Sequence, residues 1–326
     1  MNFYVTAARQ KTRLFKDADE WTQYDSGLIL RADDRRGDIE PCLQYVTPPE
    51  VRAGEEASVV FKAGARVGDR LYTCTSTEVM SFRLPAFECE DYISLPCFND
   101  LHHVCPTPEG NYLVCSTGLD LVVEVSRGGN VLREWAVLGG SPWGGRFCRE
   151  IDYRKVATTK PHLSHPSFVF QLDEQIWVTR LEQRDAVCLT EDGPRIEIAV
   201  QRPHDGILHR GRIYFTTVNG NIVIADRNSH QVLEVVDLNP ISPQYEGVLG
   251  WCRGLLVLDE RLVWVGFTRV RKTKFMENLN WIKHGLRQVE APTRIALYDL
   301  QARQCLKEID LEPAGAGLVF GIYPAD

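Results

Sequence analysis

The chain of 326 residues lacks several features that mark common functional classes. No apolar run approaches membrane-spanning length, and the start, MNFYVTAARQK, lacks the charged-then-apolar pattern of a secretion signal. Lys/Arg-rich blocks are absent outside one segment, and the net charge is −7. These absences predict a cytoplasmic protein with neither a membrane nor a nucleic acid as its partner.

Metal-type cysteine spacing is also missing. None of the ten cysteines belongs to a C-x-x-C pair, so a structural zinc cluster is not expected. Several cysteines, among them Cys115 and Cys188, occupy apolar positions of strand-like segments. We therefore expect reduced, buried thiols.

What the sequence does contain is one recurring phrase. An apolar strand ends near an acid, a turn follows, and a second strand reads Val/Cys-Leu-x-Glu-apolar. The clearest copies are Leu121–Trp135, Asn221–Leu238 and Arg294–Leu311, with looser copies at Glu78–Leu95 and Asp185–Val200. Repeats on this scale indicate a propeller or a solenoid.

Two further strand-like segments precede each copy, such as Leu101–Pro106 and Asn111–Thr117 before the first. This makes four strands per unit and five complete units. Three strands at the N-terminus and one at the C-terminus remain, and together they form a sixth unit. We predict an all-β, six-bladed β-propeller with four-stranded antiparallel blades and a closing blade shared by both termini. The single domain, 1–326, has predicted blades at approximately 1–47 plus 317–323, 57–96, 98–138, 164–200, 203–239 and 250–312.

Three connections are unusually long, at 9–25, 139–163 and 268–292. In an up-and-down blade, the loop that enters strand one and the loop that joins strands two and three lie on the same face. All three connections belong to these two types, so we expect a covered pocket at that rim. The insertion 268–292 is basic and includes the stretch FMENLNWIKHGL. It is either a lid over an acidic small molecule or a solvated loop whose short helix seals the rim.

The inner strands begin at the same rim. When the units are aligned on their second strands, four residues occupy equivalent positions and form one column. His165 lies two residues before one of them, Ser167, and strand alternation places it on the same side. Other histidines, including His162, are expected in surface loops. The column is His103, Ser167, His204 and Arg253, with His165 beside it and Asp100, His102, Asp205 and Trp251 flanking it.

These residues suggest an enzyme that acts on a small anionic or phenolic substrate. In this hypothesis His103 and His204 act as acid/base or nucleophile and His165 assists, while Arg253 and Arg180 bind the anion. Group transfer is the favoured reaction. One alternative is a hydrolase or lyase whose divalent metal, as its cofactor, is held by His103, His165 and His204. The other alternative is a non-catalytic propeller that binds a ligand or scaffolds a protein.

Two stretches carry a resemblance to a known family. Asn99–Trp135, which begins NDLHHVCPTPEGNYLV, and Asp152–Asp185, which contains HLSHPSFVF, resemble arylsulfotransferase-type propellers. In that family a histidine carries a sulfuryl group between phenols. The resemblance implies a site made by His102 or His103, His165, Arg180 and His204.

This sequence departs from the family's pattern at two positions. Val104 stands where the family has Asp, and Ser167 where it has Asn. The whole chain is also similar to the broader six-bladed group of gluconolactonase-like and strictosidine-synthase-like proteins. Lactonases of this group hold a calcium ion. The resemblance implies that the calcium ligands here would be Glu55 or Glu56, Asn99 and Asp205.

Overall fold

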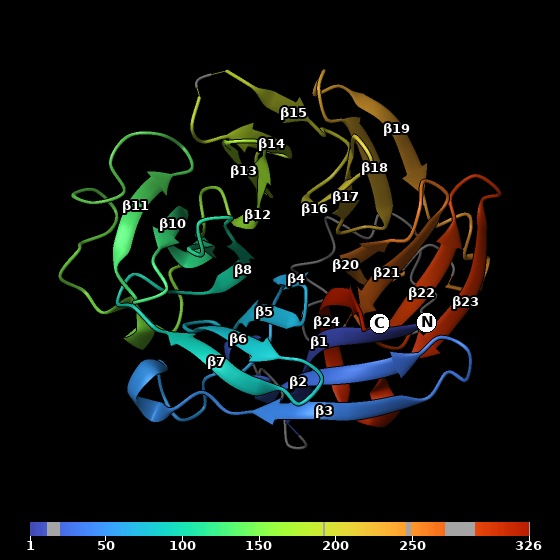
Figure 1. The fold of residues 1–326 in the computed structure, drawn as a ribbon, viewed down its shortest axis with the longest axis horizontal. Helices are drawn as coiled ribbons and strands as arrows, with labels where there is room; N and C mark the ends of the chain where they lie inside the picture. Colours follow the sequence, from blue (N-terminus) through green and yellow to red (C-terminus); the bar gives the residue numbers. More distant parts are fainter. Residues whose placement is uncertain (12–19, 192, 246–248, 271–290, 326) are drawn as a thin grey trace.

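Six four-stranded antiparallel sheets surround one axis in a computed structural model that describes residues 1–11, 20–191, 193–245, 249–270 and 291–325 (Figure 1). This arrangement confirms the predicted fold class. Twelve strands form the inner half of the blades. The innermost strands are β24 (Ala316–Pro324), β4 (Ala65–Val67), β8 (Leu101–Pro106), β12 (Pro166–Leu172), β16 (Pro203–His209) and β20 (Trp251–Val257). The second strands are β1 (Asn2–Gln10), β5 (Arg70–Cys74), β9 (Tyr112–Ser116), β13 (Gln175–Arg180), β17 (Arg212–Thr217) and β21 (Leu262–Thr268).

The outer half of each blade is built by the recurring phrase. The third strands are β2 (Tyr24–Asp33), β6 (Val79–Arg83), β10 (Leu121–Val125), β14 (Asp185–Cys188), β18 (Asn221–Asp226) and β22 (Arg294–Asp299). The outer strands are β3 (Ile39–Tyr45), β7 (Glu88–Ile93), β11 (Val131–Ala136), β15 (Arg195–Glu197), β19 (Val232–Asp237) and β23 (Gln304–Asp310). The described helices are single 3-10 turns: η1 (Glu20–Thr22), η2 (Pro49–Val51), η3 (Thr117–Leu119), η4 (Tyr153–Lys155), η5 (Pro243–Tyr245) and η7 (Glu312–Ala314). Within the described residues, none of these helices has the length and hydropathy needed to cross a membrane.

Burial explains the sequence of each strand. A strand in the middle of a blade is covered on both faces by the neighbouring blades, so β9 reads YLVCS and is buried throughout. An outer strand meets water, so β19 reads VLEVVD and is mostly exposed. The acid at the end of the repeated third strand forms the next turn. Asp226 Oδ1 accepts hydrogen bonds from the amides of Asn228 and Ser229. Asp299 Oδ1 accepts in the same way from the backbone amides two and three residues after it.

The two chain ends close the ring. β24 pairs antiparallel with β1, with Tyr4 opposite Tyr323, and the C-terminal strand becomes the innermost strand of the closing blade (Figure 1). The Tyr323 hydroxyl also accepts a hydrogen bond of 2.8 Å from the amide of Gly64 in the next blade. A Cβ on Gly64 would lie 2.0 Å from the Tyr72 carbonyl oxygen, so only glycine fits here.

The long connections have the predicted topology, and the structure describes part of each. Residues 9–25 join the second and third strands of the closing blade, and 268–292 join those of the sixth blade. Residues 139–163 enter the inner strand β12. Residues 12–19 and 271–290 lie outside the described residues, and with them the stretch FMENLNWIKHGL and most of the basic side chains. The predicted lid therefore stays a prediction.

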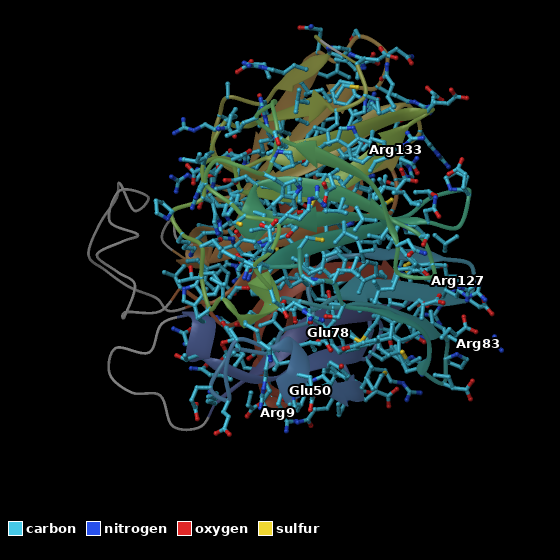
Figure 2. The ribbon with its side chains drawn as sticks, turned by 90° about the vertical axis from the view of Figure 1, so that its left-hand side faces the viewer. Arg9, Glu50, Glu78, Arg83, Arg127 and Arg133 are labelled. Carbon is cyan, nitrogen blue, oxygen red and sulfur yellow. The ribbon has the colours of Figure 1, made fainter. Side chains whose placement is uncertain are left out.

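A buried carboxylate ties the closing blade to the blade that follows it. Glu78 is fully buried and accepts hydrogen bonds from four hydroxyls: Tyr45 (2.6 Å), Thr47 (2.6 Å), Thr75 (2.6 Å) and Tyr92 (3.1 Å). Figure 2 shows Glu78 within the stack of strands, whereas Arg83 and Arg127 lie at the edge of the molecule. Buried hydroxyls that lose their acceptor carry a desolvation penalty, so Glu78 has a structural role.

We expect Glu78→Ala to lower the free energy of unfolding by about 3–5 kcal/mol, because four hydroxyl donors, two of them buried, lose one charged acceptor. Glu50→Ala is the control, since Glu50 is exposed in η2 and its removal should change stability by less than about 0.5 kcal/mol. Urea unfolding of both variants measures the difference. Equal midpoints for the two variants would contradict this assignment.

Candidate functional site

A cavity of about 180 Å³ opens at the channel mouth, at the rim where the inner strands begin. Each of the six blades contributes to its wall from its inner strand or from the segment that leads into that strand. Two loops add aromatic and basic residues: Trp21 and Tyr24 come from 9–25, and Lys160 comes from 139–163. The six inner side chains are Phe320, Lys62, His102, His165, His204 and Arg253.

Irregular backbone at the start of the inner strands aims these side chains. The register of β8 against β9 shifts between Leu101 and His103, so His102 occupies a bulge. The register of β20 shifts between Cys252 and Leu255, which places Arg253 beside a glycine in the left-handed conformation (Gly254, φ 82°). A Cβ at this glycine would lie 3.0 Å from the Phe320 carbonyl oxygen, so glycine lets the two strands approach.

His103 faces away from the cavity. Its ring stacks on Phe168 with centroids 3.6 Å apart, its Nε2 donates to the Gly64 carbonyl (3.1 Å), and its Nδ1 accepts from the Val169 amide (3.3 Å). Both nitrogens are thus used to join three blades. His103, which was predicted to be catalytic, therefore does not line the cavity, and the bulge brings His102 there instead.

Three histidines meet on the cavity wall. The ring centroids of His102 and His165 are 4.6 Å apart, and His204 lies 6.2 Å from each of them. His165 Nε2 contacts His102 Nε2 at 3.2 Å. His204 Nε2 is buried and has no hydrogen-bond partner among the described residues. A nitrogen left in this state is an acceptor or donor available to a ligand.

Sequence reasoning missed the residue that holds His165 in place. The carboxylate of Asp120 accepts hydrogen bonds from the amides of Leu163 (2.8 Å), Ser164 (2.9 Å) and His165 (2.8 Å). Asp120 and His165 both have positive φ, 50° and 57°, a conformation that is costly outside glycine and often found at functional sites. The available signal was an acid directly after the Ser-Thr-Gly-Leu turn, buried among apolar strands.

Lys62 was missed as well, although a lysine inside the apolar stretch SVVFKAGARV was visible in the sequence. Its ammonium group is buried, forms an ion pair with the Asp100 carboxylate, and lies 5.7 Å from the Phe320 ring centroid. Lysine is almost never buried without a charged partner. Asp100, which was predicted at the site, therefore holds a cation there.

Arg253 provides the second cation of the cavity. Its guanidinium lies 3.5 Å from the Phe320 ring centroid and 6.0 Å from that of Trp251, and its Nε donates to the Val319 carbonyl (2.9 Å). Stacking on an aromatic face orients a guanidinium without neutralising it. Trp251 also lies 6.4 Å from His204, ring centroid to ring centroid.

The remaining predicted residues lie outside the cavity. Arg180 forms a bidentate ion pair with Asp185 and donates to the Val137 carbonyl. The guanidinium that was expected to bind the anion is therefore already hydrogen-bonded within the protein. Asp205 is buried between two blades, where it accepts from the Thr216 hydroxyl and the Gly254 amide. Burial raises the pKa of Asp205 to about 6. Neither Arg180 nor Asp205 lines the cavity, and both are hydrogen-bonded within the fold.

Burial keeps the histidines of the site neutral. Burial, with smaller effects of Arg253 and Lys62, lowers the pKa of His204 to about 3. The pKa values of His102 and His165 lie well below the ordinary range, again chiefly because of burial. At neutral pH the cavity wall therefore combines uncharged imidazoles with more positive than negative charge, a balance that favours an anionic ligand. Its charged side chains are Lys62, Arg253, Arg52, Arg154 and Lys160, against the carboxylate of Asp100.

The residues required for a metal are not brought together. Among the described residues, no group of three or more His, Cys, Asp or Glu side chains is placed to hold a metal ion. His103 lies apart from His165 and His204, and the calcium-type counterparts are engaged elsewhere. The Asn99 amide donates to the Tyr153 and Val156 carbonyls, and Glu56 pairs with Lys11.

Comparisons with known proteins give the fold and no function. No described protein family and no curated protein matches the chain. A crystal structure of a protein of unknown function from Bacteroides caccae is similar to it, with a TM-score of 0.60 and 12% sequence identity over 99% of this chain and 98% of that chain. At this identity, the similarity shows a shared propeller fold alone.

The buried histidines predict acid sensitivity of the fold. The pKa values of His102, His103, His162, His165 and His204 are all lowered, so unfolding takes up protons at these positions below about pH 6.5. Their contribution to stability is complete above that pH and is lost as the pH falls. Asp205, with its raised pKa, acts in the opposite direction below about pH 6, but it is one group against five.

We expect the free energy of unfolding to fall between about pH 6.5 and 5, by up to about 1.4 kcal/mol per pH unit for each proton taken up. Urea unfolding at a series of pH values measures this slope. His204→Phe should make the slope shallower, because it removes one of the groups that take up a proton on unfolding. A stability that is constant from pH 8 to pH 5 would refute this view of the histidines.

Proposed function

We propose that the cavity is the active site of an enzyme that binds a small anion carried on an aromatic or phenolic group. Lys62 supplies a buried and Arg253 a half-buried positive charge, and Phe320, Trp251 and Trp21 supply aromatic surface beside them. The observation that carries the proposal is His204, whose buried Nε2 has no partner among the described residues and lies in the same cavity as these cations. The chemistry we assign to it is group transfer.

In the transfer step, His204 acts as the nucleophile, with its own proton on Nδ1. The lone pair of Nε2 forms a bond to the central atom of the anionic group, and the bond from that atom to the phenolic oxygen breaks. The oxygen leaves with the bonding electrons as a phenolate. A second phenol then takes the group from the imidazole, and its proton neutralises the phenolate. Lys62 and Arg253 stabilise the negative charge on the group throughout.

The resemblance to arylsulfotransferase-type propellers supports this choice of reaction. Of the positions that the resemblance implies, His102, His165 and His204 line the cavity, and Arg180 does not. Arg253, which comes from a different blade, takes the place of an anion-binding arginine. We also propose a cytoplasmic location, which the free state of all ten cysteines supports.

The metal-dependent alternative has less support, because Lys62 and Arg253 place positive charge beside the imidazoles and His103 is engaged with backbone groups. A purely scaffolding propeller would not need a cavity lined by buried charge. A ligand-binding protein without turnover shares the same cavity, and the experiments below separate it from an enzyme.

We expect Arg253→Gln to weaken the binding of 4-nitrophenyl sulfate about 10–100-fold, because a charge-assisted contact with an anion contributes about 1.5–3 kcal/mol. Arg303→Gln is a matched control: it removes the same charge from an exposed ion pair with Glu234 and should leave affinity unchanged. Isothermal titration calorimetry provides the measurement. If the wild-type protein binds neither 4-nitrophenyl sulfate nor 4-hydroxybenzoate, the proposed ligand class is wrong.

We expect His204→Ala to reduce the release of 4-nitrophenolate from 4-nitrophenyl sulfate, with phenol as acceptor, by about 10²–10⁴-fold. Affinity for the donor should change only several-fold, since Lys62 and Arg253 remain. The melting temperature should stay close to that of the wild type, because among the described residues His204 Nε2 has no hydrogen-bond partner that the variant would lose. Full turnover in the variant would rule out His204 as the nucleophile. Binding without turnover in the wild type would indicate a binding protein.

A further inference from the structure

A chain of three imidazoles leads from the cavity wall into the loop 139–163, and the proposed transfer step does not use it. His102 Nδ1 contacts the Asp100 carbonyl oxygen at 2.9 Å, and His102 Nε2 contacts His165 Nε2 at 3.2 Å. His165 Nδ1 in turn contacts His162 Nδ1 at 3.1 Å. His162, which was expected in a surface loop, is thus hydrogen-bonded to a histidine of the cavity.

The hydrogen bonds determine which nitrogen of each ring carries the proton. A carbonyl oxygen only accepts, so His102 must carry its proton on Nδ1. In a neutral ring His102 Nε2 is then an acceptor, and His165 must donate from Nε2. His165 Nδ1 is left as an acceptor, so His162 must donate from Nδ1. The chain therefore has one direction, with every N–H pointing toward Asp100.

One nitrogen of the chain stays unused. His162 Nε2 is buried and has no hydrogen-bond partner among the described residues. It is the position where a proton adds to the three rings without breaking any of their hydrogen bonds. It also belongs to the ring furthest along the chain from the cavity, and its neighbour Leu163 is 57% exposed.

We propose that His162, His165 and His102 form a directional proton relay, which takes up one proton at His162 and places the charge on His102 when an anion occupies the cavity. This inference rests on the proposed function in that the ligand is an anion. The proton adds to His162 Nε2, the Nδ1 proton of His162 moves to His165 Nδ1, and the Nε2 proton of His165 moves to His102 Nε2. His162 and His165 end neutral, and His102 ends as an imidazolium.

The charges around His102 explain why an anion is needed. The Asp100 carboxylate lies 3.9 Å from His102 Nδ1 and favours the charged ring. Burial opposes that charge, as do Lys62, His204 and Arg253. An anion bound between these cations offsets their repulsion, so the occupied cavity favours the proton that the empty cavity rejects.

The outer end of the relay faces charges of both signs. Asp100 and Asp120 favour a proton on His162, whereas burial, Lys160 and Arg146 oppose it. His165, in the middle, faces His102, His162 and His204, which oppose a charge there, and Asp100, which favours it. In the empty cavity these influences favour a proton on His162 over one on His102. A bound anion moves the preferred position to His102, which lines the cavity and lies beside Asp100.

Proton uptake makes anion binding depend on pH. Affinity for an anion that does not titrate itself should increase up to tenfold for each unit by which the pH falls through the range where His102 takes up its proton. Inorganic sulfate is a suitable probe, because it stays a dianion in this range.

Calorimetric titration of sulfate at about pH 6, in two buffers of different ionisation enthalpy, counts the protons taken up. We expect close to one proton per sulfate for the wild type. His102→Phe should reduce the uptake to less than half, and His209→Gln, at the opposite end of β16, should leave it unchanged. Sulfate binding with no proton uptake would overturn the relay and leave the proposed anion site standing. No sulfate binding at all would contradict both.

The tautomers provide a test that needs no variant and no ligand. ¹⁵N NMR of histidine-labelled protein at neutral pH should show His102 and His162 protonated on Nδ1 and His165 on Nε2. His162→Phe should release His165 from this constraint and shift its ring signals, which a role in packing alone would not do. The opposite set of tautomers in the wild type would overturn the directional relay.

Discussion

The pairing of β24 with β1 is the constraint on which the rest of the structure depends. It joins the two ends of the chain in one blade and makes the ring closed, so that six inner strands begin around a common rim. Each blade can then place one side chain at the same height on the axis. Tyr323, on the closing strand, also binds the Gly64 amide and so links this blade to the one that carries Lys62. The pairing of the two chain ends thereby brings six segments that are distant in the sequence to one site.

Enclosure gives that site its chemical character. Side chains that would be solvated on a surface are here packed against Phe320 and the neighbouring strands, so that burial lowers the pKa values of the histidines. The same burial leaves the charge of Lys62 little screened, and the half-buried Arg253 adds a second charge at the cavity wall. In the proposed function, the uncharged imidazole of His204 is the nucleophile, and the positive charge of the cavity wall favours an anion. The electrostatics of the site therefore follow from the fold.

The fold could be predicted from the sequence for two reasons. The repeat has a regular period with recognisable turn residues, and the strands left over at the two chain ends complete a sixth blade and so close the ring. The site could be predicted less well, because single-residue bulges decide which side chain enters the cavity. Strict alternation pointed to His103, whereas the irregular start of β8 brings in its neighbour His102. Arg180 matched a motif, yet Asp185 on the adjacent strand neutralises it. Asp120 and His162 act through hydrogen bonds to loop residues, and no sequence spacing encodes those contacts.

The central claim is that one cavity, at the rim where the inner strands begin, binds an aromatic anion. A crystal structure of the protein with bound 4-nitrophenyl sulfate tests this claim most directly. The account predicts that the sulfate group lies within hydrogen-bonding distance of Lys62 Nζ and the Arg253 guanidinium, with its sulfur facing His204 Nε2 and its ring against the aromatic side chains of the cavity. A ligand bound elsewhere, with this cavity left empty at saturating concentration, would contradict it.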